Sequence, residues 1–481
     1  MDWIDLAIYA VLFILIAVVL IRTLRFKPRA EEKPEAAPVS INKAAAASEL
    51  SEMLRCKTVS HPDESLDTPE EFEKFEALLH RLYPKLFGIC EYEKLSPRAL
   101  LLRWPGKSAD DSVVFMSHFD VVPAEEGEWE RPAFEGIIEN GEIWGRGALD
   151  TKSTLLSALH AAEMRIAEGF VPERDVYFCF GGNEEIMGYG APSIVDELEK
   201  RGVRPAMVLD EGGAIVEDVF PGVSAPCALV GIAEKGSRNI EMSALANGGH
   251  SSAPPAKSPL DSLARAVCRI HDHPFKFHIT EAAAALFDNL ARHSSFLYRM
   301  IFANLWLFAP ALNLICKKSG GELNALVRTT VAFTMASGSG GANILPSGAK
   351  VTMNVRMLSG DNTERVLARM KKLVRDEGIE FKALAGVDPK ATSPTDTDGF
   401  RAIRRAVSET YPEALTSPYL MIACSDSNHY LRICKNVYRF SGMALSSEER
   451  EMIHGKNERI PIDKLASTIE FYYRLLGILQ G

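Results

Sequence analysis

Three short, uninterrupted apolar runs, each followed at once by polar or charged residues, constrain the fold of this chain more than any other feature. The runs are 113–116 (VVFM), 176–180 (VYFCF) and 207–209 (MVL). Such runs are typical of strands buried on both faces, and the amphipathic segments between them predict helices, so the pattern indicates an α/β fold with a mostly parallel sheet. Ligands bind at the carboxyl ends of the strands in such sheets. The polar residues after the three runs are therefore expected along one rim.

The chain has 481 residues, 47% of them hydrophobic, which is enough for two domains with separate cores. We expect a catalytic domain, built from residues 44–233 and 389–481, in which helices flank the central sheet. A small α/β domain with a four-stranded sheet is expected to be inserted at 234–388. Its predicted elements are strands near 239–246, 328–335 and 350–357 and helices near 260–273 and 362–377.

Residues 4–22 are predicted to form a single transmembrane helix. The run 6–21 (LAIYAVLFILIAVVLI) carries no charge, and with its neighbours it approaches the ~20 residues that span a bilayer. A signal peptide carries positive charge before its apolar run, whereas here Asp2 and Asp5 precede the run and no small-residue cleavage site follows it. We therefore favour an uncleaved anchor over a signal peptide or a buried core helix.

Basic residues after the apolar run predict the orientation of this helix. They are Arg22, Arg25, Lys27 and Arg29. The positive-inside rule then places the catalytic domain in the cytoplasm, behind a solvated linker at 23–43 that is rich in Pro, Ala and Glu. The eight cysteines lack a CxxC pair or regular spacing, which argues against a disulfide framework or a thiolate zinc site and agrees with that compartment.

A second apolar segment lies at 277–323, and its second half is apolar enough to suggest another membrane helix. Arg299, Asn304 and Pro310 interrupt it. The interruptions favour a helical excursion that is buried or lies on the membrane surface. A true span and a contact between subunits remain as alternatives.

The charge of the chain argues against one class of partner. The formal net charge is −10, and no Lys/Arg-rich run occurs in the body of the chain. Without a basic stripe to bind phosphates, nucleic acid is not expected as a partner.

Histidine and carboxylate residues follow the predicted strands in a pattern that suits catalytic metal ions. His118 ends the first strand, and Asp120 is placed to hydrogen-bond the ring nitrogen of His118 that does not bind metal. Asp150 follows a Gly-bracketed turn (GRGALD) at the start of a helix, where its alternative role is that of a plain N-cap. The remaining candidates are Glu184, Glu185, Asp210 and His454. Oxygen and imidazole ligands without thiolates favour a catalytic zinc or a related divalent pair.

Glu184 and Glu185 are adjacent acids on a loop, and such acids are usually just solvated. In an extended turn, however, their side chains diverge. One of them can then bind metal while the other stays free to take a proton from water.

Seven segments together resemble one known family. They are SHFDVVP, WERPAFEGIIENGEIWGRGALDTK, GGNEEIMGYG, LDEGG, GGHSSAPP, NILPSGAKVTMNVRMLSGD and EMIHGKNERI. From about residue 44 to the C-terminus, and in the order of these motifs, the chain is similar to the dizinc metallopeptidases that include glutamate carboxypeptidase, aminoacylase and succinyl-diaminopimelate desuccinylase. It most resembles the branch of Gly-X carboxypeptidases and N-acyl-amino-acid hydrolases, whose members share the GRGALD and HGKNER-like strings and often carry an N-terminal anchor.

The resemblance implies two Zn²⁺ per subunit, with Co²⁺ or Mn²⁺ as alternative metals. The implied ligands are Asp150 as the bridge, His118 and Asp210 on one ion, and Glu185 and His454 on the other. Glu184 would be the general base that deprotonates the attacking water and later protonates the leaving amine. Asp120 would orient His118.

The same resemblance implies that the inserted domain is a lid that also forms a homodimer. His250 would reach into the partner's active site to stabilise the oxyanion, and Asn343 matches a second residue of that kind. Arg356 would grip the free carboxylate of the substrate, which a guanidinium fork can meet with two hydrogen bonds. Thr151, Asn183 and Asn428 depart from the family pattern, and Asn428, which replaces an arginine, leaves the details of the substrate open.

We therefore expect a metal-dependent hydrolase, tethered to a lipid bilayer, that cleaves an amide bond next to a free carboxylate. Short peptides of the Gly-X type are the first substrate class. N-acyl amino acids, including fatty-acyl ones, are the alternative, which the anchor and the apolar stretch 296–316 mildly favour. A third alternative, an inactive membrane-tethered scaffold, is disfavoured because every predicted ligand and the base are residue types suited to the chemistry.

Overall fold

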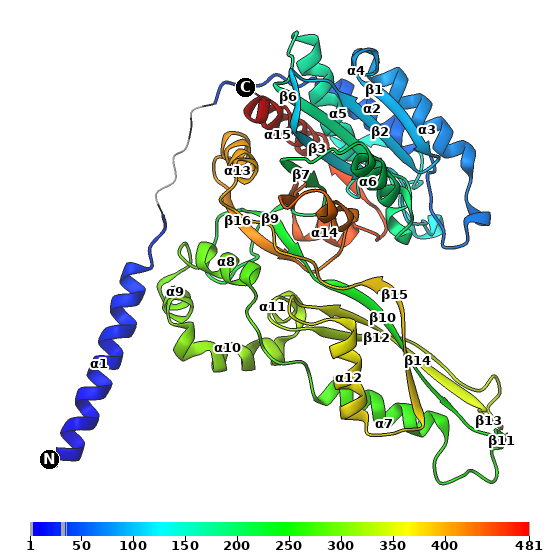
Figure 1. Cartoon of the computed structure of the whole chain (residues 1–481), viewed down its shortest axis with the longest axis vertical. Coiled ribbons are helices and arrows are strands. Elements are labelled where there is room, and N and C mark those ends of the chain that lie inside the picture. The colour runs from blue at the N-terminus through cyan, green and yellow to red at the C-terminus, as the bar shows by residue number, and fades with distance from the viewer. Residues whose placement is uncertain (1–2, 30–33, 35, 481) are drawn as a thin grey trace.

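The computed structural model describes residues 3–29, 34 and 36–480, and Figure 1 shows its three parts. A large sheet with its helices occupies the upper part of the view, a smaller sheet the lower part, and helix α1 (Trp3–Arg25) projects at the left. Residues 30–33 and 35 of the predicted linker, and Asp2 before the anchor, lie outside the described residues.

The large sheet has ten strands in the order β1-β2-β6-β3-β7-β17-β9-β8-β18, with β16 paired to β9. Their bounds are β1 Glu91–Ser96, β2 Ala99–Trp104, β3 Ser108–His118, β6 Arg174–Gly181, β7 Met207–Asp210, β8 Ile215–Val216, β9 Cys227–Glu234, β16 Leu415–Met421, β17 Val437–Arg439 and β18 Ala444–Leu445. Strand β3 runs parallel to β6 and β7, and β7 runs parallel to β17, whereas β1 and β2 add an antiparallel edge. The expected α/β fold with a mostly parallel central sheet is confirmed.

The central strands are buried on both faces. In β3, Val113 and Phe115 belong to one hydrophobic core and Val114 and Met116 to another, because alternate side chains of a strand point to opposite faces. Helices α5 and α15 contribute to the first core and α6 to the second. The helices around the sheet are α2 Lys43–Leu54, α3 Pro69–Leu82, α4 Pro84–Ile89, α5 Lys152–Ala167, α6 Gly190–Lys200, α13 Asp398–Thr410, α14 Ser447–Met452 and α15 Ile462–Gln480.

The second sheet has four strands, as expected, in the order β12-β14-β10-β15, all antiparallel. Its elements are β10 Gly236–Leu245, β12 Thr330–Ser337, β14 Gly348–Met357, β15 Ile379–Val387, α7 Pro259–Asp272 and α12 Thr363–Val374. The two helices share a separate core with the sheet. A short ladder of β11 (Gly249–His250) and β13 (Ile344–Leu345) lies at the end of this unit, far from the large sheet (Figure 1).

The segment at 277–323 forms helices that pack against the large sheet, although in sequence they lie between strands of the small one. These helices are α8 Glu281–Leu290, α9 Phe296–Ala303, α10 Leu305–Ser319 and α11 Gly321–Leu326. Leu286, Phe287 and Leu290 of α8 belong to the same hydrophobic core as the strands of the large sheet. The excursion is therefore part of the catalytic unit by packing.

Helix α1 is docked on this excursion. The Arg22 guanidinium donates two hydrogen bonds, of 3.2 and 3.0 Å, to the carbonyl of Ala303 at the end of α9. The side-chain amide nitrogen (Nδ2) of Asn304 lies 3.3 Å from the carbonyl of Val19 and 3.2 Å from the hydroxyl of Thr23. Asn304, one of the residues that interrupt the second apolar segment, thus links that segment to the first.

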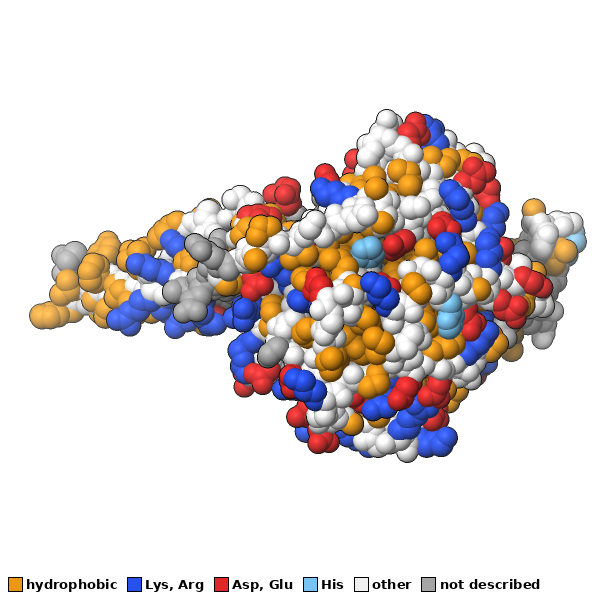
Figure 2. Space-filling view, turned by 90° about the horizontal axis from the view of Figure 1, so that it is seen from above, with side chains coloured by type: hydrophobic (Ala, Val, Ile, Leu, Met, Phe, Trp, Pro, Cys, Tyr) orange, Lys and Arg blue, Asp and Glu red, His pale blue; other side chains and the backbone are white. Residues whose placement is uncertain are grey.

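Helix α1 is long and apolar enough to cross a membrane, a property that signal sequences share. Helices α9 and α10 meet the same criterion only as a pair, and they are bent by 110°. In Figure 2 the part of the surface that projects to the left carries hydrophobic side chains at its far end and Lys and Arg side chains nearer the body. This distribution matches the apolar run of α1 and the basic residues that follow it.

Candidate active site

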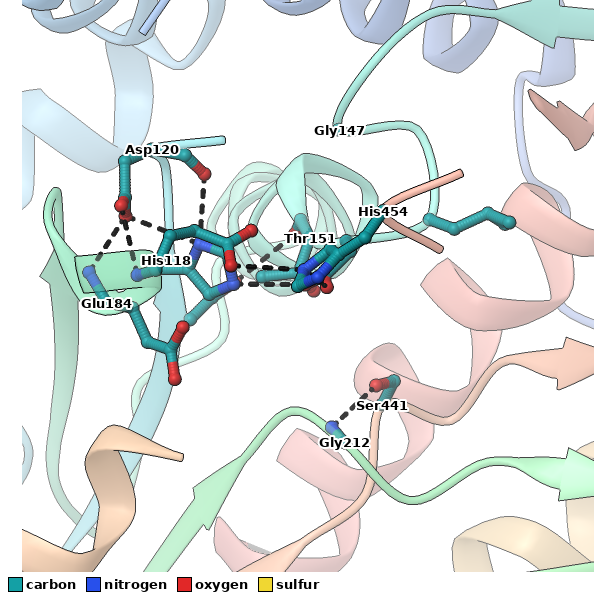
Figure 3. Close-up of polar contacts among 12 residues, drawn as sticks. His118, Asp120, Gly147, Thr151, Glu184, Gly212, Ser441 and His454 are labelled. Carbon is teal, nitrogen blue, oxygen red and sulfur yellow. Dashed lines mark hydrogen bonds and ion pairs between the residues drawn. The ribbon is translucent and has the colours of Figure 1, made fainter. Parts of the chain in front are cut away.

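The carboxyl ends of the central strands bring most of the predicted metal ligands together. His118 is the last residue of β3, and its Nε2 lies 3.0 Å from Asp150 Oδ1. The Nε2 of His454 lies 3.0 Å from Asp150 Oδ2 and 3.0 Å from Glu185 Oε2. The two histidines approach the same point from opposite sides (Figure 3). Asp150 therefore has one carboxylate oxygen on each side, as a residue shared by two ions requires.

The donor set fits a divalent metal. Ligand atoms of His118, Asp150 and Glu185 all lie within 4.8 Å of one another. The second carboxylate oxygen of Glu185 is buried and has no hydrogen-bond partner among the described residues, which costs roughly 1–3 kcal/mol unless a cation satisfies it. Imidazole nitrogens together with carboxylate oxygens are the ligands of catalytic Zn²⁺ and related ions.

The two histidines report a strongly negative potential at this point. Burial lowers the pKa of His118, but the hydrogen bonds to Asp120 and Asp150 outweigh burial and raise the pKa well above its ordinary value. Hydrogen bonds to Asp150 and Glu185 raise the pKa of His454 to about 10. Protons and metal ions compete for the same imidazole nitrogens, so cations can take the place of these protons.

Asp120 positions the loop that carries the predicted base. Its carboxylate accepts the main-chain N–H of Glu184 at 3.1 Å, that of Glu185 at 3.2 Å, and the hydroxyl of Ser60 at 2.6 Å. The Nδ1 of His118 lies 3.0 Å from the main-chain oxygen of Asp120 and 3.4 Å from its carboxylate. The shorter contact of the His118 ring is therefore to the backbone of Asp120, and the carboxylate links the end of β3 to the Glu184 turn.

Glu184 lies in the turn after β6, and its side chain lies beside His118 in Figure 3. Burial raises the pKa of its carboxyl well above the ordinary value; the charge of His118 opposes this shift, and the charges of Asp426 and Glu211 add to it. A carboxyl with a raised pKa can accept a proton and return it, as a general base that becomes a general acid must do.

Two further acids, Glu211 and Asp426, crowd the site and were given no role by the sequence. Burial raises the pKa of Glu211 well above its ordinary value, and the charges of Asp150 and Asp210 raise it further. Burial, followed by the charge of Asp210, raises the pKa of Asp426 to about 8. Glu211 could have been predicted from the sequence, because it directly follows the predicted ligand Asp210. This surplus of carboxylates favours bound cations.

Asp210 ends strand β7 and is buried. Its Oδ2 accepts the main-chain N–H of Ser427 at 3.1 Å. Burial raises the pKa of Asp210, and the positive charge of His118 is among the influences that lower it. The structure thus places Asp210 within electrostatic reach of His118, with one of its oxygens already accepting a hydrogen bond.

A buried ion pair that the sequence analysis missed joins the two loops of the site. Glu458 is fully buried, and its Oε1 accepts the N–H groups of Gly147 at 3.1 Å, Leu149 at 2.7 Å and Asp150 at 3.1 Å. Its Oε2 lies 2.7 Å from Arg146 Nη1. The Nη2 of Arg146 donates to the carbonyls of the loop 454–455 at 3.3 and 2.7 Å. The HGKNER string contains this glutamate, but its partners lie about three hundred residues away in sequence.

The three predicted substrate-binding residues lie apart from this cluster. His250 is exposed in β11, with its Nδ1 2.8 Å from the hydroxyl of Ser252, and Asn343 is exposed beside β13. Arg356 in β14 faces the junction of the two sheets, where its Nη1 lies 3.6 Å from Cys424 Sγ. Within one chain, the structure therefore brings Arg356 to the junction but leaves His250 and Asn343 at the distant tip of the small sheet (Figure 1).

A family model described as Peptidase family M20/M25/M40 matches residues 114–477, a range that includes every predicted metal ligand. The chain belongs to this family. The predicted resemblance to dizinc metallopeptidases and N-acyl-amino-acid hydrolases is thereby confirmed at the level of the family. M20 membership makes the chain a hydrolase of the metallopeptidase or amidohydrolase type.

Individual relatives of this M20 chain carry two kinds of name. "Probable carboxypeptidase S-like 2" of Dictyostelium discoideum is 33% identical over 440 residues, which cover 89% of this chain and 84% of the relative. "N-fatty-acyl-amino acid synthase/hydrolase PM20D1" of Xenopus tropicalis is 33% identical over 431 residues, covering 88% of this chain and 83% of the relative. Both substrate classes that the sequence analysis considered are therefore represented among proteins similar to this one.

Solved structures share the fold. The M20 family metallo-carboxypeptidase Sso-CP2 from Sulfolobus solfataricus aligns with a TM-score of 0.67 and 19% identity, over 92% of this chain and 99% of that one. A Bacillus subtilis protein described as a dinuclear metal binding peptidase from the M20 family aligns with a TM-score of 0.57 and 12% identity, over 91% of this chain and 99% of that one. M20 is thus a family with dinuclear metal sites.

Proposed function

We propose that this M20 chain is a dizinc hydrolase that cleaves the amide bond next to a free carboxylate. The single observation that carries the proposal is Asp150, whose two oxygens each face a different histidine 3.0 Å away. One ion would be held by His118, Asp150 and Asp210, and the other by Asp150, Glu185 and His454. Zinc is the metal we propose, with Co²⁺ or Mn²⁺ as alternatives, because imidazole and carboxylate ligands suit all three.

Bound zinc would supply Lewis acidity to the substrate carbonyl and lower the pKa of the attacking water. The protein residues handle the proton. The main-chain N–H of Glu184 donates a hydrogen bond to the carboxylate of Asp120, which positions the residue. The Glu184 carboxylate takes a proton from the water while the water attacks the carbonyl carbon. It then delivers this proton to the amide nitrogen when the C–N bond breaks, so that the products are a carboxylic acid and an amine, which together ionise to a carboxylate and an ammonium.

The free carboxylate of the substrate is proposed to bind at Arg356. Burial and, after it, the charge of Arg356 lower the pKa of the nearby Lys235 to about 7. The Nζ of Lys235 donates to the carbonyls of Ala325 at 3.0 Å and Arg328 at 2.9 Å. The guanidinium of Arg356 therefore supplies the cation that a free carboxylate would meet there. Substrates that lack a free carboxylate should therefore bind poorly.

Short peptides and N-acyl amino acids both satisfy this requirement. The name of the Dictyostelium relative favours a carboxypeptidase that acts on short peptides, as the sequence analysis expected first. The names of the vertebrate relatives favour the second candidate, an N-fatty-acyl-amino acid hydrolase. The two candidates differ in what lies on the carbonyl side of the scissile bond.

A homodimer would complete the site. His250 and Asn343 are exposed at the tip of the small sheet, where they are available to a second copy of the chain. We propose that each subunit offers these residues to the active site of its partner, with His250 stabilising the oxyanion.

Helix α1 is proposed to be an uncleaved anchor that places the enzyme on the cytoplasmic face of a membrane. Its bonds to α9 through Arg22 and Thr23 support retention, because these contacts are made only if the helix stays with the body. The basic residues at its C-terminal end support the orientation.

The experiment uses the full chain in detergent, stripped with chelator and reloaded with zinc, and tests it on dipeptides and N-acyl amino acids. We expect two zinc ions per chain by mass spectrometry and chelator-sensitive hydrolysis. Glu184→Gln should keep both ions and lower kcat by roughly 10²–10⁴-fold. The control is Glu364→Gln, at an exposed glutamate in the first turn of α12. Retained turnover in Glu184→Gln would exclude it as the base, and a chain with neither metal nor turnover would favour the scaffold alternative.

A further inference from the structure

A cavity of about 680 Å³ lies beneath the helical excursion. It is open on one side and is lined by the loop after β8, by α8 and α11, and by strands β9 and β16; the lining includes Phe220, Leu286, Leu290, Leu323, Leu326 and Tyr419. Its volume falls in the range of small-molecule sites, roughly 300–1,000 Å³. The charged residues among the described lining are Asp218 and Glu322, both acidic. The cavity therefore suits an apolar chain and disfavours the carboxylate end of a substrate.

The cavity is adjacent to the proposed carboxylate site. The Nζ of Lys235 donates to the carbonyl of Ala325 in α11 at 3.0 Å, and the carbonyl of Lys235 accepts from Cys424 Sγ at 3.1 Å. Cys424 in turn contacts Arg356. Helix α11 therefore separates the cavity, which it lines with Leu326, from the residues that would hold the substrate carboxylate.

The same helix is linked to the metal cluster. Glu322 of α11 forms an ion pair with Arg450 of α14, which ends two residues before His454. Tyr419 lines the cavity next to this ion pair, and the negative charge of Glu322 contributes to raising its pKa after burial. Through this ion pair, a wall of the cavity is joined to the segment that carries His454.

The opposite side of the cavity faces the surface on which α1 is docked. Tyr298 of α9 lines the cavity and is 40% exposed. Next to it, Phe296, Leu297 and Trp306 are exposed on α9 and α10. The bonds between Arg22 and the end of α9 place these residues beside the end of the apolar run of α1, where the surface of a bilayer would lie if α1 spans it.

We propose that this cavity is the acyl-chain site of the enzyme and that a long-chain N-acyl amino acid enters it from the bilayer across α9 and α10. The inference rests on the proposed amide hydrolysis and names its substrate class. The apolar chain occupies the cavity, the amide reaches the metal cluster between α11 and α14, and the free carboxylate remains at Arg356.

The test compares N-acetyl, N-decanoyl and N-palmitoyl forms of one amino acid, with the full chain reconstituted in phosphatidylcholine vesicles. Each methylene that enters the cavity should raise kcat/KM by up to about fourfold, until the chain fills the space. Two variants reduce the cavity: Ser224→Trp, at an exposed residue of its lining, and Val219→Phe, at a partly buried one. Ser224→Ala is the matched control that adds no volume.

In both filling variants we expect kcat/KM for the N-palmitoyl substrate to fall by roughly tenfold or more, while N-acetyl turnover stays within about twofold of the wild type. Retained N-acetyl turnover shows that the variants fold. An unchanged chain-length profile in two folded variants would overturn the inference. A bilayer phospholipid is the other source of an acyl chain. If the variants lost co-purifying phospholipid and kept the profile, the cavity would be a lipid site and the substrate assignment would be wrong.

Failure of this inference is distinguishable from failure of the proposed function. If the wild-type chain hydrolysed neither N-acetyl amino acids nor dipeptides with zinc present, the amide hydrolysis itself would be refuted. If it hydrolysed both and gained nothing from a longer acyl chain, only the acyl-chain site would be refuted.

Discussion

Replacing Glu458 with glutamine should loosen two loops of the active site at once. One oxygen of this buried carboxylate collects the N–H groups of Gly147, Leu149 and Asp150, and the other pairs with Arg146. Arg146 extends the link to the carbonyl of His454. Glutamine keeps the size of the side chain and one accepting oxygen, but it loses the charge and turns an amide N–H₂ toward a neighbour that is itself a donor.

The burial of the ion pair determines how much stability the substitution removes. Both partners of the pair are nearly inaccessible, with 0% of Glu458 and 3% of Arg146 exposed, so the guanidinium that loses its partner cannot be rehydrated. Breaking a buried pair from one side costs about 3–5 kcal/mol. For a unit of this size that loss lowers Tm by roughly 5–15 °C. The pair also holds the main chain of Asp150 and His454 by hydrogen bonds. Metal affinity should therefore fall as well, by about 10–100-fold.

Thermal unfolding with and without zinc, together with competition against a chromophoric chelator, separates the two effects. Glu163→Gln is the matched control, because Glu163 likewise accepts two main-chain N–H groups, at 3.1 and 2.7 Å, but holds helix α4 far from the site. It should lower Tm and leave zinc affinity unchanged. If Glu458→Gln lost stability with unaltered zinc affinity, the reasoning that the ion pair positions the metal ligands would be refuted.

Two further predictions concern the junction of the sheets. Arg356→Lys should raise KM by about 10–100-fold for substrates with a free carboxylate, because an ammonium cannot form the bidentate contact; equal losses on the corresponding carboxamides would contradict a carboxylate site. Burial lowers the pKa of Lys235 to about 7. Between about pH 7 and 10, the folded protein therefore binds fewer protons at this residue than the unfolded chain does. The free energy of unfolding should consequently rise with pH in this range, by up to about 1.4 kcal/mol per pH unit. Denaturant titrations of wild type and Lys235→Met across this range measure the difference, and parallel pH profiles would contradict the shift.

The local sequence was sufficient to predict the main strands and helices and the residue types of the site. Runs such as 113–116 are apolar at every position, as is typical of a strand buried on both faces. His118 and Asp210 end their strands as the pattern predicted, since the change from apolar to charged residues marks the end of a buried strand. The chemistry of oxygen and imidazole ligands follows from composition, because it depends on which residues are present.

Contacts between distant segments were decided by the tertiary structure alone. Glu458 and Arg146 are separated by 312 residues, and no periodicity relates a glutamate near the C-terminus to the loop before α5. The packing of α8–α11 on the large sheet, and of α1 on α9, likewise depends on which apolar surfaces meet after the chain has folded. The acyl-chain cavity exists only where those surfaces leave space. The sequence by itself therefore determined the strands, the helices and the ligand chemistry, because these depend on local pattern and residue type. The tertiary structure decided which segments support the site and which line the cavity, because long-range packing leaves no local signature in the sequence.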